Sequence, residues 1–152
     1  MQKITPFLWY DGKAEEAAKF YTSIFRKSKI VNVRPGPKGS VMGVEFQLEG
    51  QQFMALSSGN APFTFSSAIS LFVSCETQEE VDALWSKLTA DGGSEEMCGW
   101  LKDKYGVSWQ IIPTVLGEML QDKDAGKAKR VMEAMLQMKK INIKGLKEAY
   151  GR

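Results

Sequence analysis

One sequence pattern occurs twice in this chain, and the repetition restricts the possible folds. Residues 7–21 resemble residues 71–85 at an offset of 64 positions, with apolar, acidic and aromatic residues in the same order. A second match, at an offset of 56 positions, aligns Phe53 with Trp109. A repeated unit within one small chain predicts two copies of one structural module. A cleft shared by the two copies is then the natural place to look for a ligand.

Each copy shows the patterns of a strand, a helix and three further strands. In the first copy the expected elements are a strand at 3–10, a helix at 11–25 with Asp11 near its cap, a strand at 30–34 and a hairpin at 41–56. In the second copy they are a strand at 68–74, a helix at 77–90 and strands at 95–102 and 107–113. The strands follow from alternation of apolar and polar residues, and the helices from their longer apolar period. Thr77 with Glu80 three residues later is typical of a capped helix start.

The last part of the chain, residues 114–152, lies outside the repeat and is expected to be helical. Its apolar stripe consists of Ala128, Val131, Met132, Met135, Leu136 and Met138, and a last short helix carries Ile143, Leu146 and Tyr150. A stripe at helical spacing normally packs against its own domain or a second subunit. Because methionine is adaptable, a partner-binding surface is the alternative.

Composition excludes several classes of protein. No apolar run approaches the roughly 20 residues that span a membrane, and the first residues lack the layout of a signal peptide. Cys75 and Cys98 are the two cysteines and form no CxxC pair, so we expect a cytoplasmic, reduced protein. The chain has no histidine, which removes the commonest metal ligand and the commonest general base.

Charge is unevenly distributed along the chain. From Lys123 onward there are nine Lys or Arg and three Asp or Glu, a net charge of +6, whereas the rest carries −4. A basic segment of this kind can meet nucleic acid or an acidic partner. The lysines are not interleaved with exposed aromatic residues, so solvated helices are the simpler interpretation. We therefore expect neither a nucleic-acid partner nor a membrane.

Two stretches carry a resemblance to a known family. They are Ile4-Thr5-Pro6-Phe7-Leu8-Trp9-Tyr10-Asp11-Gly12 and Cys98-Gly99-Trp100-Leu101-Lys102-Asp103-Lys104-Tyr105-Gly106-Val107-Ser108-Trp109-Gln110-Ile111. With the tandem βαβββ pattern, they resemble the PhnB-like branch (3-demethylubiquinone-9 3-methyltransferase domain) of the vicinal-oxygen-chelate, or glyoxalase/bleomycin-resistance, superfamily. The resemblance implies an α+β fold with a glyoxalase-like domain at 1–113 (module one 1–58, module two 67–113) and a C-terminal helical extension at 114–152. By analogy it also implies a homodimer.

The superfamily's enzymes bind a divalent metal in the cleft through His, Gln or Glu side chains on the first and last strands of each module. The resemblance places these positions near Thr5-Pro6 and Ala68-Ile69, at Ala55 and at Gln110. Gln110 alone is a suitable donor, and one neutral amide cannot hold Zn²⁺ or Ni²⁺. We therefore expect no metal and no other cofactor. The methyltransferase name is also in doubt, since Gly36–Gly39 precedes a strand and no glycine-rich strand-to-helix loop is present.

Some side chains are candidates for direct chemistry, each with a structural alternative. Cys98 would need a base or a cation nearby to become a nucleophile, and a half-buried structural cysteine is favoured. Glu45 lies on the strand face opposite Val44, Phe46 and Leu48, so it is either an acid, base or ligand-orienting group or a solvated residue.

Aromatic residues on the expected cleft strands suit a flat or apolar ligand. Trp9, Trp100 and Trp109, with Gln110, are the predicted ligand-binding residues, and core packing is the alternative for each tryptophan. The sequence therefore predicts a small apolar or aromatic molecule bound in the inter-module cleft without a catalytic metal. The alternatives are a metal-independent enzyme that uses Glu45 or Cys98 and a methyltransferase.

Overall fold

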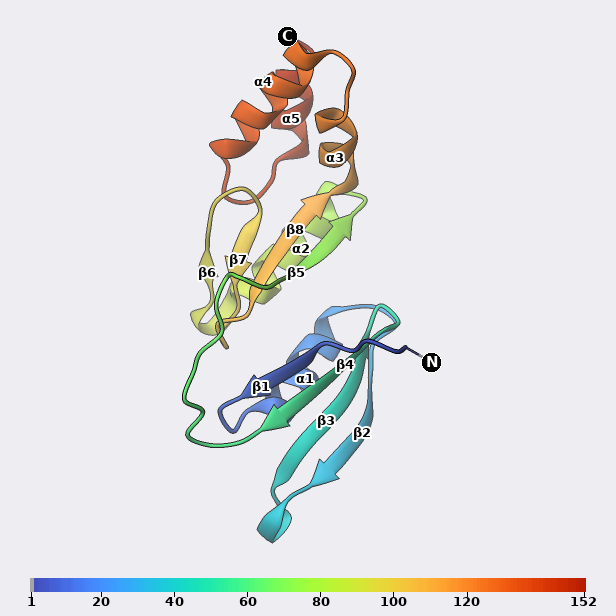
Figure 1. Cartoon of the computed structure of the whole chain (residues 1–152). Helices are drawn as coiled ribbons and strands as arrows, with labels where there is room; N and C mark the ends of the chain where they lie inside the picture. Colours follow the sequence, from blue (N-terminus) through green and yellow to red (C-terminus); the bar gives the residue numbers. More distant parts are fainter. Residues whose placement is uncertain (1) are drawn as a thin grey trace. The chain divides into compact units, whose positions relative to one another are not determined.

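The computed structural model describes residues 2–152, and their contacts divide the chain into two compact units with the boundary between Thr64 and Phe65. Each unit contains a four-stranded sheet with a helix against one face (Figure 1). The predicted α+β architecture of two βαβββ modules followed by helices is confirmed.

Unit 1 has the strand order β1-β4-β3-β2. Its elements are β1 (Phe7–Tyr10), α1 (Ala14–Ile24), β2 (Lys29–Pro35), the 3₁₀ turn η1 (Pro37–Gly39), β3 (Val41–Leu48) and β4 (Gln51–Ser57). β1 runs parallel to β4, and the other pairs are antiparallel. β2 is an edge strand whose pairing with β3 shifts register twice, between Ile30 and Asn32 and between Arg34 and Pro35.

Unit 2 repeats this topology with the order β5-β8-β7-β6. Its elements are β5 (Ser70–Cys75), α2 (Gln78–Thr89), the 3₁₀ turn η2 (Ala90–Gly92), β6 (Ser94–Glu95), β7 (Trp100–Lys102), β8 (Ser108–Pro113), α3 (Thr114–Leu120), α4 (Ala125–Leu136) and α5 (Ile143–Tyr150). β5 runs parallel to β8. Among the described residues, no helix combines the length and the apolar character needed to cross a bilayer.

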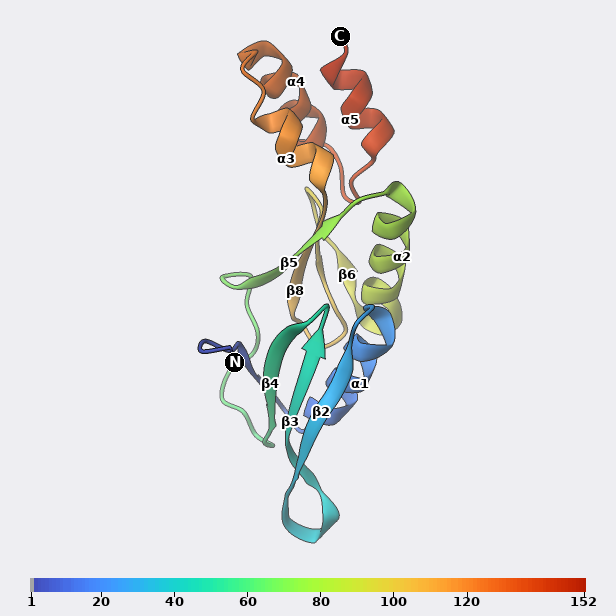
Figure 2. The ribbon, with the colours of Figure 1, turned by 90° about the vertical axis from the view of Figure 1, so that its right-hand side faces the viewer.

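Alternation along the strands buries one face of each sheet under its helix. In unit 1, Phe46 and Phe53 stack with ring centroids 5.4 Å apart, and the Tyr10 hydroxyl donates to the Tyr21 hydroxyl at 2.9 Å inside this core. Small residues on α1 allow the helix to approach the sheet closely, and Ala14, Ala17 and Ala18 are buried. The opposite face of the sheet carries no helix of unit 1 (Figure 2).

The start of α2 follows the predicted cap. The Thr77 hydroxyl accepts the Glu80 backbone N–H at 3.2 Å, while the Glu80 carboxylate accepts the backbone N–H of Glu76 at 2.9 Å. The expected cap of α1 is wrong, because α1 begins at Ala14 with Lys13 in the cap position and no side-chain hydrogen bond there.

The offset between the two copies is one residue larger for the first strands than for the helices that follow them. Three residues connect β1 to α1, and two connect β5 to α2. Phe7 pairs with Met54 and Phe72 pairs with Gln110, so equivalent strand positions are 65 residues apart rather than 64. Since a one-residue slip moves a strand side chain to the other face, Phe7 corresponds to Phe72.

The strand predicted at 95–102 is interrupted. Residues 96–99 form a loop in which Cys98 and Gly99 have φ values of 61° and 82°. Their backbone N–H groups donate to the carbonyl oxygens of Met138 and Lys139 at 2.7 and 2.8 Å. The chain leaves the sheet here because its backbone bonds to the α4–α5 connection instead.

The C-terminal helices share a core at the end of β8. Its buried members are Ile112, Leu116, Met119, Val131, Ile141 and Leu146. Met135 and Met138 of the predicted stripe pack against this cluster, whereas Met132 and Leu136 remain exposed. The stripe therefore packs within unit 2 along one of its sides.

Candidate functional site

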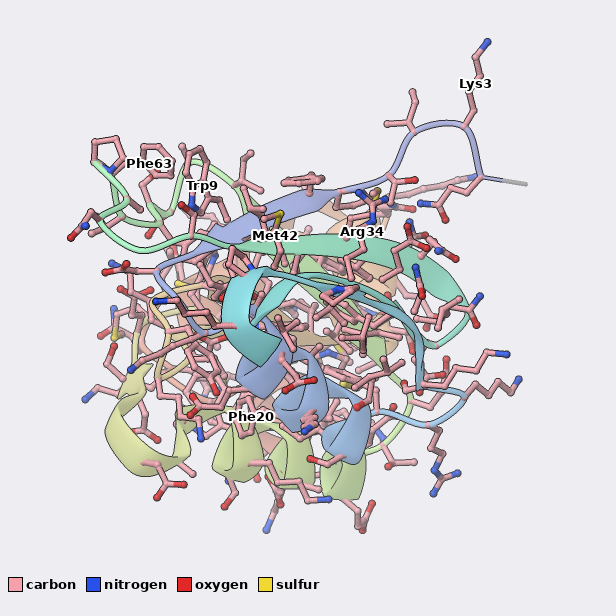
Figure 3. All side chains as sticks on the ribbon, turned by 90° about the horizontal axis from the view of Figure 1, so that it is seen from below. Lys3, Trp9, Phe20, Arg34, Met42 and Phe63 are labelled. Carbon is pink, nitrogen blue, oxygen red and sulfur yellow. The ribbon has the colours of Figure 1, made fainter. Side chains whose placement is uncertain are left out.

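The sheet face opposite α1, called here the open face of unit 1, presents apolar and aromatic side chains. By strand register, one row across the sheet is Phe7, Met54 and Glu45, and the next is Trp9, Leu56, Gly43 and Arg34. Phe7 is 55% exposed and Trp9 37% exposed. Figure 3 shows Trp9 and Arg34 on the side of the sheet away from Phe20 of α1.

Glu45 lies on this open face, as the alternation of β3 predicts, and is paired. Its Oε1 accepts a hydrogen bond from Arg34 Nη2 at 3.0 Å. The Arg34 side chain is 56% exposed and that of Glu45 24% exposed, so the guanidinium is the more accessible partner. The ion pair places charged groups beside the apolar side chains of the open face.

Trp9 is partly covered by the segment that follows β4. The ring of Phe63 meets the Trp9 ring edge-on, with centroids 4.8 Å apart and an interplanar angle of 83°. Phe63 is itself half exposed. This aromatic pair extends the apolar surface beyond the strands.

A small cavity of about 70 Å³ lies on the open face beside the ion pair. We call it the Gly43 pocket, and its side-chain walls come from Phe7, Arg34, Met42, Glu45, Met54 and Leu56. Gly43 forms its floor because the residue carries no side chain between Leu56 and Arg34. Sequence analysis missed this pocket, since the cross-strand neighbours of Gly43 depend on the register of the sheet.

The sheet face of unit 2 away from α2 holds two of the predicted ligand-binding residues. Phe72, Gln110 and Trp100 form one cross-strand row. The Gln110 side-chain amide donates to the Ser70 hydroxyl at 2.9 Å. Phe72 is exposed and Trp100 is partly buried. The inter-module cleft predicted from the sequence stays a prediction.

Trp109 lies on the α2 side of the unit 2 sheet and is 2% exposed. Its indole N–H donates to Asp103 Oδ2 at 2.9 Å, and Asp103 Oδ1 accepts the backbone N–H groups of Tyr105 and Val107 at 2.8 and 3.1 Å. Asp103 is itself buried and organises the β7–β8 turn. Sequence analysis gave Asp103 no role, although an acid at the first position of a turn shortly before a tryptophan is a signal for such a contact.

The two cysteines occupy different surroundings. Cys98 is partly buried in the loop at 96–99, where its backbone N–H is bound. Cys75 is fully buried at the end of β5, and burial, together with Glu80 and Glu76, raises the pKa of its thiol to about 12. A nucleophilic thiolate at Cys75 is therefore disfavoured at neutral pH.

The raised pKa of the Cys75 thiol should lower the free energy of unfolding at alkaline pH. The unfolded thiol loses its proton near the ordinary pKa of 9.0, whereas the pKa of the folded thiol is about 12, so stability falls as pH rises through this window. We expect a loss of about 1.4 kcal/mol between neutral pH and pH 10 from this group. Urea titrations of the wild type and of Cys75→Ala at both pH values should show the smaller loss in the variant. Equal losses in the two proteins would contradict this assignment.

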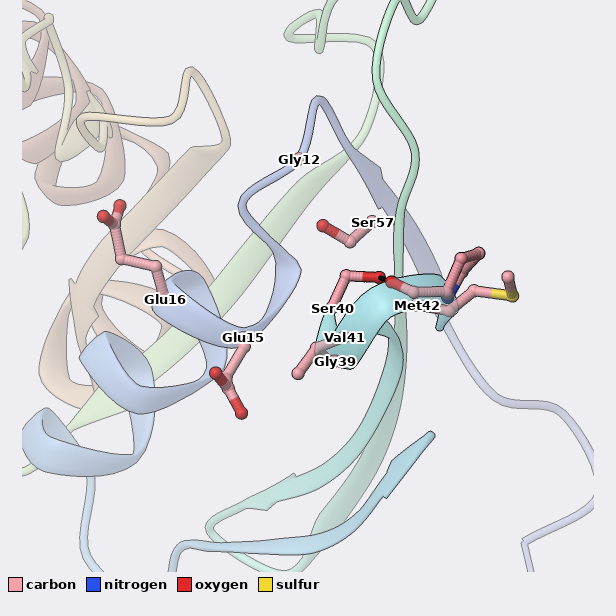
Figure 4. Close-up of a pocket in the computed structure, with 9 residues that line it drawn as sticks. Gly12, Glu15, Glu16, Gly39, Ser40, Val41, Met42 and Ser57 are labelled. Carbon is pink, nitrogen blue, oxygen red and sulfur yellow. Dashed lines mark hydrogen bonds between the residues drawn. The ribbon is translucent and has the colours of Figure 1, made fainter. Parts of the chain in front are cut away.

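A second, larger cavity in unit 1 has a volume of about 510 Å³ and lies between the start of α1 and the β2–β3 connection (Figure 4). Glu15, Glu16, Ser40 and Ser57 are its polar lining residues. Ser57 Oγ accepts the Ala14 backbone N–H at 3.4 Å, so this hydroxyl supports the helix start. Acidic residues in a first helical turn complement the helix dipole, which accounts for Glu15 and Glu16.

The donor set does not fit the divalent metal of the superfamily's enzymes. Ala55 is buried on the α1 side, and Met54 rather than Ala55 occupies the open-face position of β4, which corrects the placement expected from the sequence. Gln110 is a single neutral amide. Within residues 2–152, no three His, Cys, Asp or Glu side chains are grouped so that they could hold a metal.

Comparison with known proteins agrees with the fold. The PhnB protein from Bacillus cereus is 45% identical, covers 74% of this chain and 100% of its own, and superposes with a TM-score of 0.70. PA1353 from Pseudomonas aeruginosa is 20% identical over 72% of this chain and 95% of its own, with a TM-score of 0.59. The fosfomycin resistance protein FosX from Listeria monocytogenes is 14% identical over 72% of this chain and 90% of its own, with a TM-score of 0.55.

A search of the curated proteins gives no match. Residues 2–112, well over half of the chain, match the family described as 3-demethylubiquinone-9 3-methyltransferase. The chain therefore belongs to the 3-demethylubiquinone-9 3-methyltransferase family, the PhnB-like group.

Proposed function

We propose that the protein binds a small apolar or aromatic molecule on the open face of unit 1, without a metal. The observation that carries the proposal is the group of exposed apolar side chains on this face: Phe7, Trp9, Met42 and Phe63 are each 37–55% exposed. Concentrated apolar surface on a folded protein marks interaction sites and ligand-binding grooves. The Arg34–Glu45 pair supplies the few polar contacts that orient a ligand in a mostly apolar site.

Trp9→Ala and Phe7→Ala are each expected to weaken binding of a neutral aromatic probe, N-phenyl-1-naphthylamine, by about tenfold. Removal of a ring that a ligand covers forfeits roughly 1.5–3 kcal/mol of apolar burial, and tenfold corresponds to about 1.4 kcal/mol. Fluorescence titration measures the affinity. Leu136→Ala is the matched control, because Leu136 is 50% exposed on α4.

An unchanged affinity in both open-face variants, or an equal loss in Leu136→Ala, would contradict the proposed site. Native mass spectrometry of the same samples reports the bound mass and the oligomeric state, for which we propose a homodimer by analogy with the superfamily. A probe recovered with unchanged mass after incubation supports binding without turnover.

Glu45 suggests a second candidate function, a metal-independent enzyme, because its carboxylate lies in the wall of the Gly43 pocket. A carboxylate in a cavity wall can act as a general acid or base. Methyl transfer has less support. The Gly36–Gly39 segment connects β2 to β3 through a 3₁₀ turn, whereas nucleotide-type methyl donors sit on a loop from a strand to a helix.

A further inference from the structure

The Gly43 pocket joins apolar walls to an accessible cation. Phe7, Met54 and Leu56 line it on the side of β1 and β4, and Arg34 and Glu45 line it on the side of β2 and β3. A volume of about 70 Å³ is far below the roughly 300–1,000 Å³ of a complete ligand site. The pocket therefore suits one small polar group of a molecule whose apolar part lies on the surrounding face.

The charge of the open face favours an anion at this point. Strand register places Lys29, Arg34 and Glu45 on this face, opposite Gln47, Gly43 and Met54 respectively. Two cations and one acid give it a net positive charge. Among the described residues, the guanidinium of Arg34 makes one hydrogen bond, to Glu45 Oε1. An arginine has five N–H donors in a planar fork, so donors remain for a second acceptor.

We propose that the ligand is an apolar or aromatic carboxylate, whose carboxylate group enters the Gly43 pocket and accepts hydrogen bonds from Arg34. The inference rests on the ligand-binding function proposed above and adds the chemical class of the ligand. Glu45 holds the guanidinium in place through Oε1, and the aromatic part of the ligand covers Phe7 and Trp9. Planar carboxylates match the arginine fork in geometry.

The test compares three naphthalene compounds of nearly equal size: 1-naphthoate, 1-naphthamide and 1-naphthylmethylamine. Each displaces N-phenyl-1-naphthylamine from the wild-type protein in a fluorescence competition at pH 7. We expect naphthoate to bind about tenfold more tightly than naphthamide, the gain typical of a charge-assisted hydrogen bond. The cationic amine should bind more weakly than either.

Substitutions of the ion pair should shift this selectivity in opposite directions. Arg34→Gln removes the cation and should abolish the tenfold advantage of naphthoate over naphthamide. Glu45→Gln removes the competing negative charge and should increase the advantage by about threefold, since the guanidinium then faces the ligand without a counter-ion. A purely structural role for the pair would lower both affinities in both variants.

Gly43→Ala tests the pocket by its volume. A Cβ at Gly43 would lie 3.4 Å from the Ala55 carbonyl oxygen and 3.7 Å from Arg34 Cδ, so the sheet accommodates the methyl group while the pocket loses its floor space. The advantage of naphthoate over naphthamide should fall by at least about threefold. Gly117→Ala, where a Cβ meets nothing within 4 Å, is the control and should leave the advantage unchanged.

Three results would overturn the inference. If the neutral compounds bind but naphthoate has no advantage, the carboxylate assignment fails and the proposed ligand-binding function stands. If the amine binds most tightly, Glu45 rather than Arg34 sets the charge preference. If neither the fluorescent probe nor any naphthalene compound binds, the proposed function fails together with the inference.

Discussion

Replacement of Asp103 with alanine is expected to lower the free energy of unfolding of unit 2 by about 3–5 kcal/mol. The carboxylate is 2% exposed and accepts the indole N–H of Trp109 and the backbone N–H groups of Tyr105 and Val107. Alanine leaves these donors without their acceptor in a turn whose Asp103, Val107 and Trp109 are buried. Urea titration followed by tryptophan fluorescence measures the loss, because Trp85, Trp100 and Trp109 all report from unit 2.

Asp103→Asn is the matched control for shape. Its amide oxygen can still accept the two backbone N–H groups, but its NH₂ group would face the indole N–H of Trp109, so we expect an intermediate loss of about 1–2 kcal/mol. Trp109→Phe should cost less in the Asp103→Ala background than in the wild type, because the bond it removes is already absent. A loss below about 1 kcal/mol in Asp103→Ala would show that water replaces the carboxylate at little cost.

The second large effect is expected from Gly99→Ala, which should destabilise unit 2 by about 3 kcal/mol. Gly99 has φ 82°, where an added Cβ costs about 1–2 kcal/mol. The new atom would also lie 2.6 Å from Ile112 Cδ1, 3.0 Å from the Ile111 carbonyl oxygen and 3.1 Å from Ile141 Cγ1. Overpacking of a close-packed core adds about 1–3 kcal/mol.

Gly106→Ala separates these two costs within the same unit. Gly106 has φ 89°, and a Cβ there meets nothing within 4 Å, so only the backbone cost of about 1–2 kcal/mol remains. The difference between the two variants in urea titrations measures the crowding at Gly99. Equal losses would mean that the C-terminal helices shift away without cost, and that the 96–99 loop is not fixed by the core of α3, α4 and α5.

Local patterns in the sequence were sufficient to predict the modules of this protein. Alternation in 41–56 located the β3–β4 hairpin and placed Glu45 opposite the buried face of β3. Thr77, predicted as the capping residue, directly precedes the first residue of α2. These signals succeed because the interactions that decide them lie within a few residues of one another.

The incorrect predictions depended on distant partners or on register. The loop at 96–99 interrupts a strand-like sequence because its backbone donors meet acceptors at Met138 and Lys139, about forty positions later. The expected metal-ligand position on β4 was placed at Ala55, whereas Met54 lies on the open face. A one-residue error of this kind exchanges the two faces of a strand. The pairing of Arg34 with Glu45 likewise follows from a β-bulge that no local pattern announces.

The irregular edge formed by β2 has a consequence for self-association. An exposed edge strand offers unpaired backbone groups to a strand from another molecule, and Val31 and Val33 are exposed on β2. Its two register shifts and the terminal Pro35 interrupt the regular spacing of donors and acceptors that such an addition requires. Copies of this chain should therefore not extend the unit 1 sheet from molecule to molecule through β2.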